Sequence, residues 1–454
     1  MAARALCVSL PLLASGAQLD VLTLPNWQRI PVGEMGFLEG GAVVARVDGP
    51  AAGFHNPAGL ARLHRPSVSG ALSVVDYTRT ASRTNTGEAR ADDVGLKPNL
   101  VGFSSWWDAK AGVEEAGAGK PGFSLFLASP TTWSSTLEVR SNLPAGSRRD
   151  DGRSSFEINA AGVAAGRPLG RDWSVGAALE GWFTSYRYDA GASASDGATV
   201  LTSSFTEQGR SIAARAAVGV LWQKGSWKVG LHVRSPGLAL TDNGEVKSAT
   251  TSGGAAGSSR TEVVDGKAGF GFRLPWQVTL GVACTPSFLP SVTLEADLGM
   301  HGAVSRRRLF GPASGTTTTV NAGGSTTAPH AVPARFLDLR AVYNPSGGLA
   351  WRLPYKPWGR TTTVHLGGFI QRSPAANSET FADLDLIGGT LGASFAKGPV
   401  RVTLGGCYVA SATLAEAIRF ITSPQQGINP TLSSPNARFA VRSFVFGIGS
   451  TYEF

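Results

Sequence analysis

The chain has 454 residues, a formal net charge of +9 and only 16% charged residues, against about 25% in an average soluble protein. Its mean hydropathy is +0.01, and it has no run of about 18 apolar residues, which excludes a protein that crosses the membrane with helices. The one tight basic triplet, Arg306-Arg307-Arg308, has no aromatic stacking platform beside it, which argues against nucleic acid as a partner. A polar average suits a transmembrane barrel, because half of its wall faces water.

The N-terminus resembles a secretory signal peptide. Arg4 precedes a short apolar run at 6–14, and the small residues Ser15-Gly16-Ala17 follow. We therefore expect 1–17 to be a signal peptide that is cleaved after Ala17. Residues 18–65 come next, rich in Gly, Ala and Pro and with little strand alternation. Small residues permit close packing, so this segment is expected to form a compact hatch, or plug, inside a lumen.

Period-two alternation begins after this segment and recurs to the end of the chain. In 227–234, for example, Trp227, Val229 and Leu231 alternate with Lys228, Gly230 and His232. Most such segments reach the roughly 9–11 residues that a tilted strand needs to cross a bilayer. We predict fourteen strands, at 66–80, 97–108, 121–130, 152–166, 172–188, 207–223, 226–240, 263–285, 291–304, 334–351, 360–373, 384–397, 399–412 and 439–454.

The connections between these strands alternate in length. Short turns are expected at 167–172, 223–226, 285–290 and 396–399, and long polar loops at 131–151, 189–206, 241–262 and 305–333. Short turns at one end and long loops at the other are typical of outer-membrane barrels. The chain also ends on an alternating strand with Tyr452 and Phe454 on its apolar face. The fold class predicted is an all-β, antiparallel transmembrane barrel spanning 66–454.

Catalytic signatures are missing from the sequence. It has no GxSxG, HExxH, Walker or CxxC motif, and its six His residues are dispersed. Glu295 and Asp297 share the polar face of one strand, where paired carboxylates could carry out acid–base chemistry. The simpler interpretation, which we favour, is a pair of lumen charges balanced by Lys228 or Arg234. We expect neither an enzyme nor a metal site.

The segment before the first strand resembles the hatch of the FadL/TodX family of outer-membrane transporters of hydrophobic compounds. That hatch has a glycine pattern, then an acidic residue, then Asn-Pro-Ala. The matching positions here are Gly36, Gly40, Gly41, Ala42, Asp48, Asn56, Pro57 and Ala58. Segments 231–246 and 274–298 also look like strands of the family.

The resemblance implies a fourteen-strand barrel plugged by the hatch, in the outer membrane of a Gram-negative bacterium. It implies passive uptake of long-chain fatty acids or other hydrophobic compounds, with sideways exit through the wall near a kinked third strand, and no cofactor. The expected partners are these small molecules, outer-membrane lipid and lipopolysaccharide, and the barrel-assembly machinery, which would engage the C-terminal strand. We expect a monomer.

Two questions stay open from the sequence. The family captures substrate with apolar surface loops, and the apolar candidates here are Trp133, Leu137 and Val139 in the loop expected at 131–151. Fatty acids and aromatic hydrocarbons cannot be separated, because both need only apolar pockets. The alternative function is a surface structural or adhesion barrel whose long loops bind a partner.

Overall fold

A computed structural model describes most of the chain. The described residues are 18–19, 26–84, 87–107, 120–143, 146–195, 199–254, 257–265, 268–321, 324–375, 383–412, 415–416, 420–421 and 438–454. The expected signal peptide, 1–17, lies outside them. Within this part of the chain, no helix is both long enough and apolar enough to cross a bilayer.

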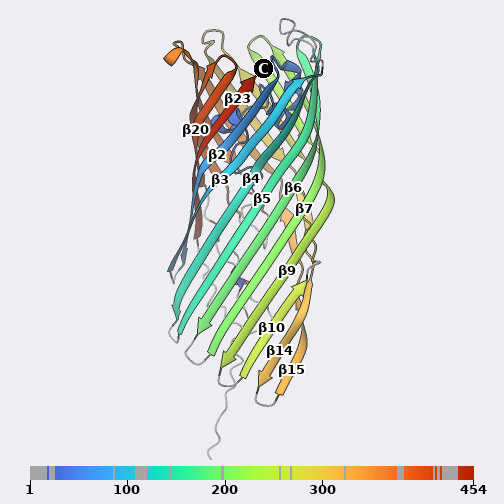
Figure 1. Cartoon of the computed structure of the whole chain (residues 1–454), viewed down its shortest axis with the longest axis vertical. Helices are drawn as coiled ribbons and strands as arrows, with labels where there is room; N and C mark the ends of the chain where they lie inside the picture. The colour runs from blue at the N-terminus through green and yellow to red at the C-terminus, as the bar shows by residue number, and fades with distance from the viewer. Residues whose placement is uncertain are drawn as a thin grey trace, which may run out of the picture.

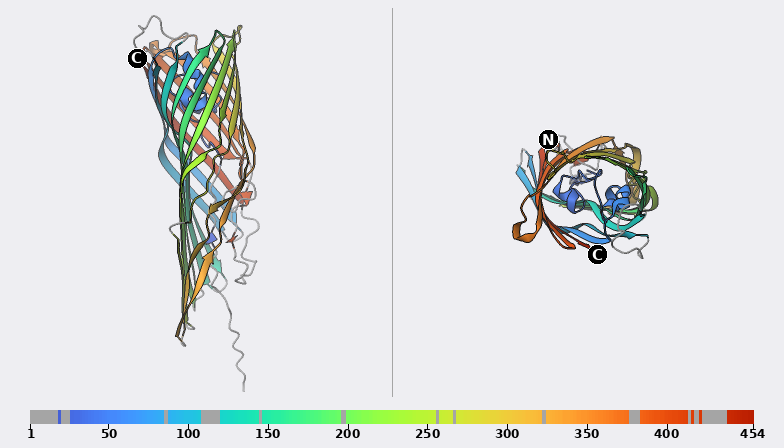
Figure 2. Two further views of the ribbon diagram at one scale, coloured as in Figure 1. Left: turned by 90° about the vertical axis from the view of Figure 1, so that its right-hand side faces the viewer. Right: turned by 90° about the horizontal axis from the view of Figure 1, so that it is seen from above.

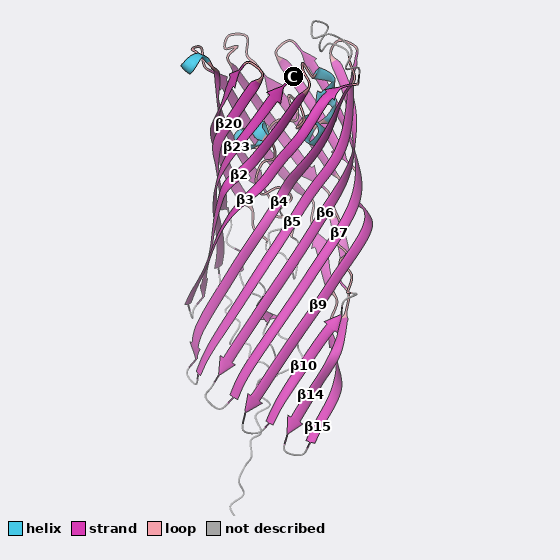
Figure 3. Cartoon of the chain, viewed as in Figure 1, coloured by secondary structure: helices cyan, strands magenta, loops and turns pink. Residues whose placement is uncertain are grey.

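The described strands close into one antiparallel barrel that the chain crosses fourteen times (Figures 1 and 3). The last strand, β23 (Arg438–Glu453), completes the ring by pairing with the first long strand, β2 (Ser67–Thr84), with Ser67 opposite Glu453. On its other edge β23 pairs with β20 (Val400–Ser411). The predicted fold class and strand number are therefore confirmed.

Several of the fourteen crossings consist of two or three consecutive strands with short breaks between them. The remaining strands of the barrel wall follow in chain order. They are β3 (Gly87–Trp106), β4 (Gly122–Leu143), β5 (Gly146–Leu169), β6 (Trp173–Ser195), β7 (Thr199–Lys224), β8 (Trp227–Arg234), β9 (Leu238–Gly254), β10 (Gly257–Asp265), β11 (Gln277–Cys284), β12 (Val292–His301), β14 (Ala313–Asn321), β15 (Gly324–Val332), β17 (Val342–Arg352), β18 (Thr361–Gln371), β19 (Leu386–Lys397) and β21 (Ala415–Glu416). Two short pairs form separate two-stranded sheets and are not part of the barrel sheet. They are β1 (Gln18–Leu19) with β22 (Phe420–Ile421), and β13 (Val304–Phe310) with β16 (Arg335–Leu339).

An apolar outer band lies toward the end of the barrel that carries the short turns, which we call the short-turn end. On β6 the outward residues Trp173, Leu179 and Phe183 are exposed. Further along the same face, Arg187 forms an exposed ion pair with Asp189. The stretch from Trp173 to Phe183 has the length that a tilted strand needs to cross a bilayer. The strands then continue well past the band, and β9, β10, β14 and β15 reach the far end in Figure 1.

The long loops predicted from the sequence are mostly strand, so that prediction is wrong. Residues 131–143 belong to β4 and 146–151 to β5, and these strands stay paired until Leu143 lies opposite Gly146. Beyond the apolar band the outer face of a strand meets water instead of lipid, so its outward residues need not be apolar although backbone pairing continues. The alternation therefore marks the membrane crossing and not the full strand.

Residues 26–65, which we call the lumenal segment, lie inside the ring toward the short-turn end (Figure 2). The segment contains α1 (Glu34–Leu38), α2 (Ala52–His55) and a 3-10 helix, η1 (Pro57–Arg62). Helix α1 packs against β18, β19, β20 and β23, whereas α2 packs on β4 and β5 and η1 on β4 to β7. The segment therefore reaches from one side of the wall to the other.

Candidate functional site

Strands β3 and β4 are paired over only part of their length. They pair from Leu100, opposite Ala128, to Trp106, opposite Gly122. Among the described residues, 87–99 of β3 pair only with β2, and 131–143 of β4 pair only with β5. We call this unpaired stretch of the wall the seam.

A bulge in β4 marks the start of the seam. The register between β4 and β5 shifts between Ala128 and Thr131, so that Ser129 and Pro130 together replace one residue of a regular ladder. Pro130 has no backbone N–H to donate, and neither has Pro98 on the facing strand. Both prolines border a small cavity of ≈ 20 Å³ whose inner side includes Arg29 and Ile30 of the lumenal segment.

The lumenal segment lines the seam from within and is bonded to both of its strands. Asn99 of β3 accepts from the backbone N–H of Gly33 at 2.5 Å and donates to the Pro31 carbonyl at 3.0 Å. On β4, the Thr131 hydroxyl donates to the Trp27 carbonyl at 2.7 Å. These side-chain bonds satisfy backbone groups that would otherwise be buried without a partner.

A cationic side chain lies beside these contacts. Arg29 is buried, with its guanidinium 5.8 Å from the ring centroid of Trp133 and its Nη1 donating to Ser443 Oγ at 3.4 Å. Trp133 was a candidate for surface capture, but the structure places its side chain in the interior, 1% exposed. Leu137 and Val139 lie further along β4, and their side chains are outside the described part of the structure.

A column of aromatic rings leads through the interior to this side of the barrel. Tyr186 lies 6.0 Å from Phe270, Phe270 lies 6.1 Å from Phe272, and Phe272 lies 6.2 Å from Trp27, measured between ring centroids. Phe156 and Phe310 pack beside this column. The Trp27 ring stacks in turn on His301, with 5.8 Å between ring centroids, and the Trp27 carbonyl accepts a hydrogen bond from Thr131 next to the bulge.

No pattern in the sequence predicts this column. Phe270 and Phe272 lie between β10 and β11, where the chain leaves the wall, and Phe270 forms an isolated bridge with Phe310 at the end of β13. These residues turn inward from interruptions in the strands. The alternation of side chains along a strand cannot identify such residues, since it holds only where the strand is uninterrupted.

On the side away from the seam, ion pairs hold the lumenal segment to the wall. Arg46 pairs with Glu39 in the segment and with Glu295 of β12, at 2.5 Å from the latter. Glu39 also lies 2.8 Å from His365 of β18. Both carboxylates are fully buried, so their attraction to Arg46 is little screened by water.

Backbone amides complete this network. Asp297 accepts from the N–H groups of Val43 and Val44 at 2.9 and 3.0 Å, and Glu295 accepts from Ala45 N at 2.7 Å. The expectation that Lys228 or Arg234 balances these carboxylates is wrong, because the lumenal segment supplies the partners. Arg234 instead pairs with Glu180 at 3.0 Å. Sequence reasoning missed this pairing because the partners are about 250 residues apart.

The Asn56-Pro57 turn packs against the wall at the start of η1. Asn56 is fully buried; its side chain donates to the Val44 and Val220 carbonyls at 2.9 and 3.3 Å and accepts from Ala58 N at 3.2 Å. A Cβ on Gly219 of β7 would lie only 2.0 Å from Asn56 Oδ1. A glycine in the wall is therefore what allows this turn to come so close.

The other predicted hatch residues lie at separate places in the lumenal segment. Gly36 is buried in α1, facing His55. Gly40 has a φ of +67°, and a Cβ there would meet the Gly368 backbone at 2.7 Å, so both its conformation and its surroundings require glycine. Asp48 is exposed at the short-turn end. Their assignment to a substrate path stays a prediction.

His55 is the buried titratable group at the centre of the lumenal segment. Its Nε2 lies 2.9 Å from the Val32 carbonyl, to which the neutral imidazole donates. Burial lowers the pKa of His55 to about 4; the hydrogen bond to Val32 offsets part of this fall, and the nearby Arg234 adds a smaller lowering. The imidazole is therefore neutral at pH 7.

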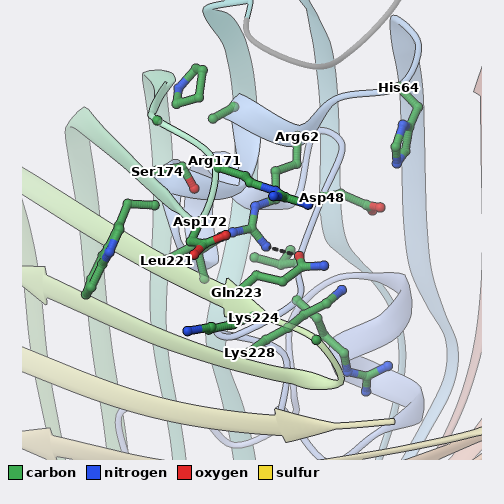
Figure 4. A pocket seen from close by; sticks show the side chains of 17 residues that line it. Asp48, Arg62, His64, Arg171, Asp172, Ser174, Leu221, Gln223, Lys224 and Lys228 are labelled. Carbon is green, nitrogen blue, oxygen red and sulfur yellow. Dashed lines mark hydrogen bonds between the residues drawn. The ribbon is translucent and has the colours of Figure 1, made fainter. Parts of the chain in front are cut away.

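A cavity of ≈ 1030 Å³ opens at the short-turn end between the lumenal segment and the wall (Figure 4). Residues 46–48 and 61–64 line it from inside, and the β5–β6 and β7–β8 turns line it from the wall.

No group of three or more His, Cys, Asp or Glu side chains able to hold a metal ion occurs in the described part of the chain.

No family model and no curated protein sequence matches this chain. Its structure is similar to crystal structures of a Pseudomonas aeruginosa FadL homologue (TM-score 0.59, 11% identity, 94% of this chain and 100% of that one) and of the P. putida toluene transporter TodX (TM-score 0.61, 14%, 94% and 99%). The Ralstonia pickettii toluene transporter TbuX is similar to the same degree (TM-score 0.57, 14%, 94% and 99%). The chain therefore has the fold of the FadL homologue and of the toluene transporters TodX and TbuX.

Proposed function

We propose that this protein is an outer-membrane channel for passive uptake of hydrophobic compounds, which leave the barrel sideways through the seam between β3 and β4. The observation that carries the proposal is the seam itself, a stretch of wall whose two strands are not paired to each other. The seam starts at the level where the apolar outer band ends, because Phe183 of β6 lies opposite Asn159 of β5, beside the bulge in β4. A hydrophobic molecule that leaves at this start of the seam reaches the bilayer without crossing the short-turn end.

The interior chemistry supports this route. The aromatic column from Tyr186 to Trp27 offers apolar surface continuously up to the seam. Transfer of an alkyl chain from water to such surface is favourable by about 0.8 kcal/mol per CH₂, and transfer onward into lipid costs little because both environments are apolar. The column is packed, so rings and the lumenal segment have to move for a molecule to pass.

The direction of transport follows from the usual orientation of such barrels, in which short turns face the periplasm. The extended strands then stand outside the cell, and substrate enters from there. TodX and TbuX are toluene transporters, which supports aromatic hydrocarbons as substrates. Long-chain fatty acids belong to the same proposed class of hydrophobic compounds.

The test is uptake by a deletion strain of the native host. Labelled oleate and labelled toluene are supplied separately, with and without the gene on a plasmid. We expect uptake of at least one compound to fall in the deletion strain and to return with the plasmid. Normal uptake of both would contradict the proposal and favour a surface structural or adhesion barrel, with the lumenal segment as a simple plug.

A further inference from the structure

The cavity at the short-turn end brings together cations from two separate parts of the molecule. Arg62 belongs to η1 of the lumenal segment. The wall supplies three more cations, at or beside the β5–β6 and β7–β8 turns: Arg171, Lys224 and Lys228 (Figure 4). Of the described residues that line the cavity, only Asp48 and Asp172 are carboxylates.

None of these four cations forms an ion pair within the described part of the chain. Arg62 instead donates from Nη1 to the neutral Gln223 Oε1 at 2.5 Å. Arg46 also lines the cavity, but it is already paired with two buried carboxylates. The lining therefore keeps an excess of positive charge that the channel function does not use.

The cations of the lumenal segment and of the wall are close enough to repel one another. Lys228 is half-buried on the inward face of β8, and Arg62 is half-buried in η1. Arg62 repels Lys228 more strongly than Asp48 attracts it. A concave wall concentrates the field of such charges, and an anion inside it is attracted by all of them at once. An anion between the segment and the wall would therefore turn their repulsion into attraction.

The surface that the cavity offers to a ligand is hydrophilic. Among its apolar residues, Val47, Ala61 and Leu221 are buried, and Trp173 is exposed on the outer face of β6. The hydrogen-bond donors open to a ligand are the exposed or half-buried side chains of Arg62, His64, Arg171, Gln223, Lys224 and Lys228. A ligand that suits this lining is a hydrophilic anion with several acceptor oxygens.

We propose that this cavity binds a phosphate-bearing anion, which bridges Arg62 of the lumenal segment to Arg171 and Lys228 of the wall and so holds the segment in place. A phosphate monoester carries a charge of about −1.5 to −2 at pH 7 and three acceptor oxygens. It can therefore accept charge-assisted hydrogen bonds from both sides at once, and the guanidinium fork matches its geometry.

This chemistry has two sources, a soluble phosphate ester or the phosphate headgroup of a membrane lipid. The site does not rest on the proposed uptake function, because the bridge requires only the docked lumenal segment and the wall.

The test measures binding to the purified full-length protein by titration calorimetry, in a non-ionic detergent and a phosphate-free buffer. The probes are glycerol 3-phosphate, dihexanoylphosphatidic acid, which is the same phosphate monoester with two short acyl chains, and acetate. The test variants are Lys224→Gln/Lys228→Gln on the wall and Arg62→Gln on the segment. The matched control is Lys397→Gln, an exposed lysine at the end of β19 that does not line the cavity. Heat-modifiable migration on gels verifies that each variant is folded.

We expect the double variant to bind glycerol 3-phosphate at least about tenfold more weakly than the native protein, because it loses two charge-assisted donors. Lys397→Gln should bind it normally, and added sodium chloride should weaken binding. Hydrogen exchange of residues 57–64 should slow about tenfold in the native protein at a ligand concentration of ten times Kd, since the ligand binds only the docked segment. Arg62→Gln should show no such slowing.

Equal binding of glycerol 3-phosphate to the native protein and the double variant would overturn the proposal. Acetate binding as tight as that of glycerol 3-phosphate, or phosphate binding that leaves exchange of 57–64 unchanged, would overturn it as well. If the phosphates bind as expected, tighter binding of glycerol 3-phosphate assigns the site to soluble esters, and tighter binding of dihexanoylphosphatidic acid assigns it to a lipid headgroup. None of these measurements involves uptake, so a failure here is distinguishable from a failure of the channel function, which is measured in the deletion strain.

Discussion

Two neighbouring junctions of the same wall behave differently. Strands β5 and β6 pair without a break from Ser147, opposite Ser195, to Leu169, opposite Trp173. Strands β3 and β4 are of similar length, 20 and 22 residues, but they pair only from Leu100 to Trp106 of β3. The β3–β4 junction carries irregularities that the β5–β6 junction lacks. They are the bulge at Ser129-Pro130 of β4 and a register shift of β3 against β2 at Asn99, with Pro98 and Pro130 bordering the same small cavity.

This difference shows what an opening in a barrel wall requires. Backbone groups at membrane depth have to be satisfied inside the protein, because lipid offers no hydrogen bonds. At the β5–β6 junction the neighbouring strand satisfies them. At the seam, the side chains of Asn99 and Thr131 instead satisfy backbone groups of the lumenal segment, which lines the strands from within. The seam and the segment that lines it are therefore one structural unit, and four changes test this view.

Removal of the bulge should have the largest effect. Deletion of Pro130 leaves Ser129 alone between Ala128 and Thr131, which restores a regular register with β5 and lets β4 approach β3. We expect uptake to fall at least about tenfold, to near the level of the deletion strain, while the barrel still assembles. Pro130→Ala, which keeps the extra residue, is the matched control. Full uptake by the deletion variant would place the exit elsewhere.

Loss of the ion pairs on the opposite side should loosen the lumenal segment. Arg46→Met leaves the buried Glu39 and Glu295 without their cation, which costs about 3–5 kcal/mol for a buried pair. Hydrogen exchange of residues 34–48 should accelerate accordingly. Arg187→Met, which breaks only the exposed pair with Asp189, should change exchange little. Unchanged exchange in Arg46→Met would show that the pair does not hold the segment.

The Asn56-Pro57 turn should have a smaller effect. Asn56→Ala with Pro57→Gly removes three side-chain hydrogen bonds of a buried residue and frees the backbone, at a cost of about 2–3 kcal/mol. We expect lowered uptake with normal heat-modifiable migration, since the wall pairs without this turn. Normal uptake at normal surface levels would make the turn purely structural.

Acidification should have the smallest effect of the four changes, a loss of stability of the docked lumenal segment. His55 has a pKa of about 4 in the folded segment and about 6.5 when released, so protons favour release. The docked segment therefore keeps its full stability above about pH 6.5 and loses it progressively toward pH 4. The loss is about 2 kcal/mol at pH 5.

The measurement compares hydrogen exchange of residues 52–62 at pH 7 and pH 5 after correction for intrinsic rates. His55→Gln, which can still donate to the Val32 carbonyl but does not titrate, should show a smaller pH dependence than the native protein. Equal pH dependence in the two proteins would assign the effect to other groups.

Local pattern was sufficient for the barrel. The fourteen crossings, the closing strand from 439 to 454 and the short turns could all be predicted, because lipid imposes period-two alternation on every crossing strand, whatever its neighbours. The outward apolar alternation ends where lipid ends, so the sequence pattern predicts loops for the extended parts of β4, β5, β9 and β10, which the structure shows as strand.

The contacts that make up the candidate site were decided only by the tertiary structure. The seam depends on which residues of β3 and β4 remain unpaired, the Glu295 and Asp297 partners come from the lumenal segment, and the aromatic column uses residues where strands are interrupted. The basic cavity likewise joins η1 to two turns more than 100 residues further along the chain. Such contacts join residues far apart in the sequence, so no local period records them, and only the closed barrel brings them together.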